Sequence, residues 1–267
     1  MPELPEMETY KNLLNEKISG NVISNVIVNR EKTININVEP FQQQLLNKKV
    51  IQVKRRAKHL IFELDSGMNL LLHLMLGGWM YFGNEQDEPD RTKQVILSFP
   101  NGNLYFIGLR LGYLHLLNPQ QLQGKLSEIG QEPLDPNFTY DSFLQLIASR
   151  RGMLKTTLIN QSFLAGIGNC YSDEICFQAK LKPTNKFNDL NELQTKNLYH
   201  SIITILQSGI QQGGYMDSPF TNNDPLTGGY RTLVYDKEGQ PCPRCNTPII
   251  LEHVSSKKTF YCRICQL

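Results

Sequence analysis

Apolar residues fall at helical spacing directly after the start of the chain. Successive apolar positions are three or four residues apart, at Met7, Tyr10, Leu14 and Ile18. They therefore share one face of an α-helix. Pro5 suits the first turn of such a helix, and Gly20 is suited to end it. The pattern predicts one helix that presents an apolar face to the residues that follow.

Residues 21–117 alternate between short apolar runs and turn residues. Asp65-Ser66-Gly67 and Asn101-Gly102 interrupt these runs, and Asn-Gly is a strong signal for the tight turn of a β-hairpin. Residues 85–93 are polar and are expected to form an exposed loop. The first half of the chain is therefore predicted to be rich in β-strands.

The pattern becomes helical after residues 130–136, whose glycine and prolines are typical of a linker. Helices are predicted over residues 140–149, 156–161, 170–179 and 189–212. A glycine-rich turn at 164–169 separates the second helix from the third, and 213–229 is predicted as a flexible loop. A β-hairpin that carries four cysteines closes the chain. The expected domains are residues 1–130, 138–230 and 231–267, with a linker at 131–137.

The composition suits a soluble protein. Of 267 residues, 40% are apolar and 19% are charged, and the formal net charge is only +2. No apolar run is long enough to span a bilayer, and the start lacks the pattern of a signal peptide. We therefore expect no membrane partner and a cytoplasmic protein. Basic residues gather at 54–58, at 150–155 and at 257–263. One such cluster is usually a solvated surface, but three beside other candidate site residues favour contact with nucleic acid.

Four cysteines near the end of the chain form two CxxC pairs, Cys242-x2-Cys245 and Cys262-x2-Cys265. Each pair makes a tight turn that directs two thiolates at one ion, so two pairs complete a tetrahedron. Four thiolates favour zinc and leave no coordination position open for catalysis. We predict one structural zinc ion. The basic residues 255–259 between the pairs are expected at an exposed hairpin tip that could meet phosphates.

The second residue offers nucleophilic chemistry once Met1 is removed. Pro2 would then carry a free secondary amine. An α-amino group titrates near about 8, against about 10.4 for lysine. More of it is unprotonated at neutral pH, and it can attack a sugar carbon to form a Schiff base. Glu3 is close enough to donate or accept a proton, and Glu6, one helical turn further, could hold the geometry. On this segment alone, a processed terminus ahead of an acidic helix start is the simpler interpretation.

Four motifs occur together and in order. They are Pro-Glu-Leu-Pro-Glu at 2–6, Arg-Arg-Ala-Lys-His-Leu at 55–60, Leu-Ala-Gly-Ile-Gly-Asn at 164–169, and the four cysteines. With them the chain resembles the formamidopyrimidine-DNA glycosylase/endonuclease VIII family over essentially its whole length, and is most similar to the formamidopyrimidine branch. The resemblance implies an α+β fold. It would have an N-terminal β-sandwich with a flanking helix, and a C-terminal helix–two-turn–helix domain with a β-hairpin zinc finger.

The resemblance also implies a role for each matching residue. Pro2 would attack C1′ of the damaged nucleotide, Glu3 would be the general acid that opens the sugar ring, and Lys58 would assist β-elimination. Lys257 would act with them from the tip of the zinc hairpin, and Glu6 would support the site. The implied DNA contacts are His73, Leu76, Arg110, Arg150, Lys155, Asn169 and Lys257.

Residues that wedge into the duplex in this family are altered here. Leu76 stands at the position of a methionine, although Met75 is one residue away. Leu109 and Leu111 stand where an arginine and a phenylalanine are expected, and Arg110 is the only arginine left for that role. An aliphatic side chain can fill the gap left by a flipped base but cannot stack as phenylalanine does.

Two further positions depart from the family's pattern. Thr92-Lys93-Gln94 replaces a His-x-His, and Lys257 replaces the usual arginine of the hairpin tip. Lysine keeps the positive charge but loses the bidentate grip on phosphate. Since these changes concern lesion search rather than Pro2, Glu3 and Lys58, we expect catalysis at abasic sites to be retained. We expect the preference for 8-oxoguanine to be weakened.

The leading hypothesis is a base-excision-repair DNA glycosylase with β,δ-elimination activity at abasic sites. It would act as a monomer on double-stranded DNA that contains a damaged base or an abasic site, and would be associated with the nucleoid when bound. A non-catalytic binder of damaged DNA on the same scaffold is the second hypothesis, and the altered wedge positions favour it. An unrelated zinc-ribbon interaction protein explains neither the start at Pro2 nor the glycine turn before Asn169.

Overall fold

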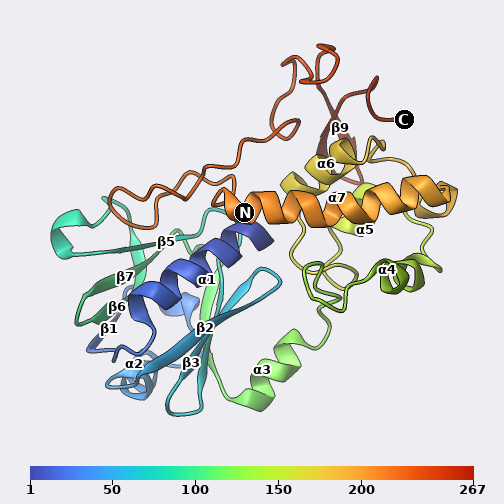
Figure 1. Ribbon diagram of the computed structural model, residues 1–267. Coiled ribbons are helices and arrows are strands. Elements are labelled where there is room, and N and C mark those ends of the chain that lie inside the picture. Colours follow the sequence, from blue (N-terminus) through green and yellow to red (C-terminus); the bar gives the residue numbers. More distant parts are fainter. The chain divides into compact units, whose positions relative to one another are not determined.

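The computed structural model describes residues 1–267, and they form two compact units (Figure 1). Unit 1 consists of Met1–Glu128 and Gln212–Gly229, and unit 2 of Ile129–Gln211 and Tyr230–Leu267. The chain passes from unit 1 to unit 2 after Glu128, and Gln212–Gly229 returns to pack with unit 1. The C-terminal hairpin with its four cysteines shares unit 2 with the helices.

Unit 1 is built around two four-stranded antiparallel sheets, with strand orders β1-β6-β7-β5 and β2-β3-β4-β8. The strands are β1 Asn25–Val28, β2 Val50–Arg56, β3 His59–Leu64, β4 Asn69–His73, β5 Trp79–Gly83, β6 Lys93–Phe99, β7 Gly102–Ile107 and β8 Tyr113–Leu117. Alternate residues of both sheets share one core, in which the rings of Phe62 and Phe106 lie 6.3 Å apart. The α+β class and the β-sandwich are confirmed. Both predicted hairpin turns are present, between β3 and β4 and between β6 and β7.

Helix α1 (Leu4–Ile18) packs against the sandwich as the apolar spacing predicts. Its four apolar positions, Met7, Tyr10, Leu14 and Ile18, are at most 2% exposed. The side chain of Asn15 exchanges two hydrogen bonds with the backbone of Val53, at 2.7 and 2.8 Å, which joins α1 to β2. This helix therefore sets the position of the residues at its own start.

Two helices of unit 1 were not predicted from the sequence. Helix α2 (Val38–Leu45) is short, and polar residues interrupt its pattern of apolar positions. Helix α3 (Pro119–Leu126) follows β8. The start of α3 carries a signal that periodicity does not detect. Asn118 and Gln121 exchange side chain-to-backbone hydrogen bonds at 2.9 Å, which is a capping box. Two 3-10 turns, η1 Glu31–Thr33 and η2 Glu85–Asp87, complete the unit.

Unit 2 is mainly helical and ends in a two-stranded hairpin (Figure 1). Its elements are α4 Tyr140–Ile147, α5 Leu154–Leu158, α6 Asn169–Gln178, η3 Phe187–Asp189, α7 Glu192–Gln211, β9 Ile250–Val254 and β10 Lys257–Tyr261. The four predicted helices are present with shifted ends. Ser255 and Ser256, between β9 and β10, have φ values of 48° and 63°, as a tight two-residue hairpin turn requires. None of the helices is long and apolar enough to cross a membrane.

Candidate active site and metal site

The start of α1 buries two carboxylates beside Pro2. Glu3 and Glu6 are each 2% exposed, and Pro2 is buried as well. One oxygen of Glu6 accepts the N–H of Glu3 at 2.8 Å, and the other accepts the N–H of Tyr215 at 2.9 Å. Gly214, at φ +78°, has no room for a side chain, because a Cβ there would collide with the carboxylate of Glu6. The predicted supporting residue Glu6 thus joins α1 to the segment Gln212–Gly229.

The hydroxyl of Tyr215 lies at the other end of this arrangement. It donates to the carbonyl of Met1 at 3.3 Å. That carbonyl belongs to the peptide bond between Met1 and Pro2, so the hydroxyl of Tyr215 contacts the residue whose removal would free the nitrogen of Pro2. Sequence reasoning did not identify Tyr215, because only the fold brings it to the start of the chain.

Lys58 occupies the two-residue turn between β2 and β3, and its side chain is only 4% exposed. Ala57, at φ 51°, adopts the left-handed conformation that closes this turn. Arg55 fixes the turn to α1, because its guanidinium donates to Glu8 at 2.6 Å and to the carbonyl of Ala57 at 3.2 Å. Burial lowers the pKa of Lys58, and the charges of Glu3 and Glu6 oppose that shift. The predicted catalytic residues Glu3 and Lys58 are therefore neighbours in the fold.

His73 ends β4 in the same sheet. Its Nδ1 accepts the N–H of Met75 at 3.0 Å, and its ring lies 4.5 Å from that of His59. Burial, reinforced by His59 and Lys58, lowers the pKa of His73 to about 3. The ring is therefore neutral near pH 7, and since Nδ1 is an acceptor, its proton is on Nε2. His73 can offer one N–H to an anion without carrying a charge.

The expected wedge residues lie on two adjacent loops of unit 1. Leu76 is 67% exposed and Leu111 is 64% exposed. The loops touch backbone to backbone, since a Cβ on Gly108 would collide with the carbonyl of Gly77. Leu109, at 0% exposure, points into the sandwich core. The side chains of Leu76 and Leu111 therefore protrude from these loops. Leu109, which stands where the family has an arginine, is buried.

Unit 2 brings the four predicted metal ligands together. The sulfur atoms of Cys242, Cys245, Cys262 and Cys265 lie within 4.8 Å of one another. The pair Cys242–Cys265 is separated by 3.8 Å and the pair Cys245–Cys262 by 3.5 Å. Thiolates about 2.3 Å from a tetrahedral ion would be separated by about 3.8 Å. The four sulfurs can therefore hold one metal ion, as the CxxC spacing predicts.

The N-terminus of α6 carries Asn169, which is half-buried at the end of the glycine turn. Gly166 has φ +85°, which favours glycine, and its N–H is accepted by the side chain of Gln161 at 2.9 Å. The same side chain donates to the carbonyl of Ile167 at 2.7 Å. The turn is therefore held rigidly by internal hydrogen bonds.

Lys155 was predicted to contact DNA, and the structure corrects this. Its side chain is 0% exposed and forms an ion pair of 2.6 Å with Asp173, which is also fully buried. Its ammonium also donates to the carbonyl of Asn169 at 2.8 Å, and Asp173 accepts the N–H of Phe260 at 3.0 Å. A side chain without exposed surface cannot touch phosphate. Lys155 instead supports the glycine turn and, through Asp173, the hairpin β9–β10.

The other predicted contacts of unit 2 lie at the surface. Lys257 is exposed directly after the hairpin turn. Arg150 is half-buried, with its guanidinium 5.0 Å from the centre of the Phe163 ring, which is cation–π geometry.

Sequence reasoning also missed Glu174. This buried carboxylate accepts the backbone N–H groups of Leu233, Val234 and Tyr235 at 2.9 Å. It therefore fixes the segment that leads to the metal site. An Asp-Glu pair inside a helix with no other charged residue was the available signal.

Comparisons with known proteins agree with this geometry. The N-terminal domain of formamidopyrimidine-DNA glycosylase matches residues 1–113, and the H2TH domain of formamidopyrimidine-DNA glycosylase matches residues 129–219. The formamidopyrimidine-DNA glycosylases of Pelotomaculum thermopropionicum and Protochlamydia amoebophila are each 34% identical to this chain, and each alignment covers 100% of this chain and 99% of the relative.

Solved structures give the same result. A Lactococcus lactis Fpg mutant in complex with Fapy-dG containing DNA superposes with a TM-score of 0.90 at 29% identity, over 99% of both chains. The Lactococcus lactis Fpg bound to abasic site containing DNA gives a TM-score of 0.90 at 28% identity, again over 99% of both chains. The chain belongs to the formamidopyrimidine-DNA glycosylase family.

Proposed function

We propose that this protein is a base-excision-repair DNA glycosylase that removes an oxidised base and then cleaves the strand at the resulting abasic site. The observation that carries the proposal is the buried group of Pro2, Glu3 and Lys58 in unit 1. An amine, a carboxylate and a lysine with a lowered pKa, buried close together, suit nucleophilic and acid–base chemistry.

Removal of Met1 exposes the secondary amine of Pro2. The damaged nucleotide leaves the base stack, since its C1′ is otherwise out of reach. The nitrogen of Pro2 then attacks C1′, the glycosidic bond breaks, and the base departs with the bonding electron pair. The amine loses its proton as the new N–C1′ bond forms, and the departing base takes up a proton, so that charge is conserved.

Opening of the sugar ring gives an iminium between Pro2 and C1′. Glu3 donates the proton that the ring oxygen needs, and Glu6 keeps Glu3 in place through its hydrogen bond to the backbone. The iminium makes the hydrogen on C2′ acidic, so loss of that proton expels the 3′-phosphate in a β-elimination. A second, δ-elimination expels the 5′-phosphate. Lys58 contacts the phosphate and assists these steps.

Partly exposed or exposed groups of each unit suit phosphate contacts. His73 offers a neutral N–H on unit 1, and Lys257 offers a positive charge on unit 2. Asn169 lies at the N-terminus of α6, where the backbone amides and the helix dipole attract anions. Such contacts carry no sequence information and make binding strongly salt-dependent.

The metal that the four cysteines hold is proposed to be zinc, because four thiolates in a tetrahedral arrangement favour that ion. It supplies structural cross-linking and no chemical step. With the ion bound, the two CxxC turns are joined and the hairpin β9–β10 presents Lys257 at its tip.

Borohydride reduction of the enzyme on abasic-site DNA tests the proposal. We expect a covalent adduct whose mass places the sugar on Pro2, with Met1 absent from the mature protein. Pro2→Gly should abolish the adduct, and Glu3→Gln should still bind abasic DNA but trap it slowly. Tight binding without any adduct would instead establish the second hypothesis, a non-catalytic binder. A flat salt dependence of binding would contradict DNA as the partner.

A further inference from the structure

The sheet β2-β3-β4-β8 carries helix α3 on the face that points away from the sandwich core. Leu122 and Leu126 of α3 pack there against Ile61, Leu71 and Leu117. Next to this contact a groove of about 490 Å³, the α3 groove, stays open between the helix and the strands. Its volume falls within the range of about 300–1,000 Å³ that is typical of small-ligand sites.

The α3 groove is largely apolar and has no charge left to pair. Its walls include Ile51, Leu64, Met68, Pro119, Leu122 and Leu126. Glu63 is the only ionisable residue that lines it. One oxygen of this carboxylate is paired with Lys54 at 2.6 Å, and the other accepts a hydrogen bond from the side chain of Gln52 at 2.6 Å. A charged ligand would lose its hydration without gaining a partner, so the groove favours a neutral one.

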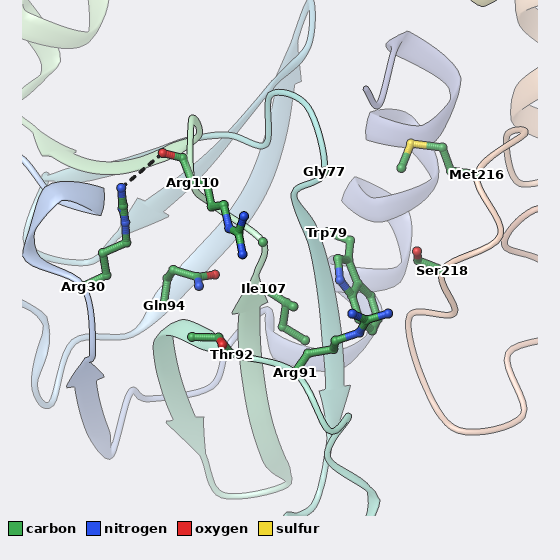
Figure 2. Close-up of a pocket in the computed structure, with 11 residues that line it drawn as sticks. Arg30, Gly77, Trp79, Arg91, Thr92, Gln94, Ile107, Arg110, Met216 and Ser218 are labelled. Atoms are coloured by element: carbon green, nitrogen blue, oxygen red, sulfur yellow. Dashed lines mark hydrogen bonds between the residues drawn. The ribbon is translucent and has the colours of Figure 1, made fainter.

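The cavity on the outer face of the other sheet has the opposite character. It has a volume of about 730 Å³ and is lined by Arg30, Arg91 and Arg110 (Figure 2). Gly77 and Gly108, from the two loops that carry the exposed leucines, line it as well. Its positive charge suits the phosphates of DNA. No residue with a proposed role on DNA lines the α3 groove.

Asn69 places a side-chain amide in the α3 groove. The residue begins β4, in register with Glu63 of β3 and Leu117 of β8. It is only 7% exposed, and its side chain forms no hydrogen bond within the protein. A buried amide without a partner destabilises the fold. Because the groove is open, a ligand can reach this amide and supply the missing partner.

This chemistry suits a lactam on an apolar body. The amide of Asn69 offers N–H donors and a carbonyl acceptor. The ring of a lactam holds its N–H and its carbonyl on one side, so both can pair with one carboxamide. An open-chain trans amide presents the two groups on opposite sides and could form only one of these bonds. An apolar ring system would also leave water on contact with Ile51, Met68 and Leu122.

We propose that the α3 groove binds a neutral, apolar lactam whose N–H and carbonyl pair with the side chain of Asn69. This site goes beyond the proposed function and does not depend on it. His73 ends β4 four residues after Asn69, which places the two residues about 13 Å apart. The ligand and DNA would therefore bind at the same time.

Quinolin-2-one, which carries a lactam on a flat apolar body, is the probe. Its titration into the full-length protein is followed by NMR, through the side-chain amide of Asn69 and the methyl groups of the groove. We expect saturable shifts with a dissociation constant of about 1–5 mM, as ligands of this size typically reach. N-Methylquinolin-2-one lacks the donor and should bind about fivefold or more weakly.

Thymine distinguishes an apolar lactam from a free nucleobase. It has the same lactam edge but little apolar surface, so it should bind more weakly than quinolin-2-one. Tighter binding of thymine would show that the groove takes nucleobases, and would overturn the apolar class of ligand.

Three variants test the residues of the groove. Asn69→Leu should remove the difference between quinolin-2-one and its N-methyl derivative. Without ligand it should raise the midpoint of chemical denaturation, because an aliphatic group replaces a buried amide that has no partner. Ile51→Asp places a charge on a wall residue that is 47% exposed, and should weaken the binding of both compounds. Leu46→Asp is the matched control, since Leu46 is 42% exposed outside the groove, and should leave binding unchanged.

Several outcomes would overturn the proposal. They are the absence of a saturable shift, equal affinity of the wild type for the two quinolinones, and shifts centred on Trp79 in the cavity of Figure 2. A lower denaturation midpoint of Asn69→Leu would do the same, because it would show that the fold already satisfies the amide. Borohydride trapping on abasic-site DNA should be unchanged in Asn69→Leu and with quinolin-2-one bound. Absence of lactam binding with intact trapping refutes only the groove, and absence of trapping with intact lactam binding refutes only the proposed function.

Discussion

The carboxylate of Glu6 accepts the backbone N–H of Tyr215 at 2.9 Å and thereby joins the first turn of α1 to the segment Gln212–Gly229. Its second oxygen holds the N–H of Glu3 at 2.8 Å. One buried side chain therefore holds both the backbone of the proposed acid, Glu3, and the backbone of Tyr215, whose hydroxyl contacts Met1. Gly214 makes this contact possible, because any larger residue there would occupy the space of the carboxylate.

Glu6→Gln should reduce both stability and catalysis. The glutamine side chain has one acceptor oxygen where glutamate has two. The backbone N–H of either Glu3 or Tyr215 would therefore face an NH₂ group. A buried unsatisfied donor costs about 1–3 kcal/mol, which chemical denaturation can measure. Borohydride trapping should slow more than binding to abasic DNA weakens. Glu16→Gln, on the exposed side of the same helix, is the matched control and should leave both unchanged. Equal losses in the two variants would contradict this role.

Stability should fall in acid through His73. The folded protein keeps this ring neutral until about pH 3, whereas the unfolded chain binds a proton near about pH 6.5. The stabilising contribution is therefore complete above about pH 6.5 and is lost as the pH falls towards about 3. His73→Asn keeps an acceptor for Met75 and removes the titration. Its free energy of unfolding should depend less on pH between 7 and 5 than that of the wild type. Parallel curves for the two proteins would count against the buried neutral histidine.

Cys262→Ser should remove the metal and the order of the zinc hairpin. Three thiolates bind zinc more weakly than four, and so short a segment depends on its ion to fold. Elemental analysis should find about one zinc ion per wild-type chain and much less in the variant, with weaker DNA binding. Cys176→Ala removes a buried thiol outside the cluster and should keep the ion. Full retention of zinc by Cys262→Ser would refute the four-cysteine site.

Variants of Lys155 and Lys257 should distinguish a lysine that stabilises the fold from one that contacts DNA. Lys155→Met leaves the buried carboxylate of Asp173 unpaired, which costs about 3–5 kcal/mol of stability. The double variant Lys155→Met/Asp173→Asn should recover part of that loss. Lys257→Ala should leave the free energy of unfolding unchanged and reduce the salt dependence of DNA binding by about one phosphate contact. If Lys155→Met were stable but bound DNA more weakly, the result would support a direct contact between Lys155 and DNA and contradict its buried role.

Leu76→Met combined with Leu111→Phe should raise the excision of 8-oxoguanine. Phenylalanine stacks on a neighbouring base where leucine cannot, and aromatic stacking contributes about 0.5–1.5 kcal/mol. We expect a gain of up to about tenfold in single-turnover excision, with cleavage at abasic sites unchanged. Leu193→Met, at an equally exposed position of α7, serves as control. Strong 8-oxoguanine excision by the unmodified protein would contradict the weakened preference.

Local patterns in the sequence determined much of this protein. The spacing from Met7 to Ile18 fixed α1, Asn101-Gly102 fixed a hairpin, and the CxxC pairs fixed the metal ligands. Each of these features depends on neighbouring residues, because helical period, turn geometry and paired thiolates act over a few positions. The proposed roles of Pro2, Glu3 and Lys58 came from the resemblance to the family, and the fold buries all three residues.

Only the tertiary structure decided how distant residues act. Lys155 follows a basic pair in the sequence and was expected at the surface, yet the packing of α5 against α6 buries it on Asp173. Tyr215 reaches the start of the chain because Gln212–Gly229 returns to unit 1. Burial and long-range hydrogen bonds depend on which elements pack together. A local pattern contains no record of the partner that a side chain will find across more than two hundred residues.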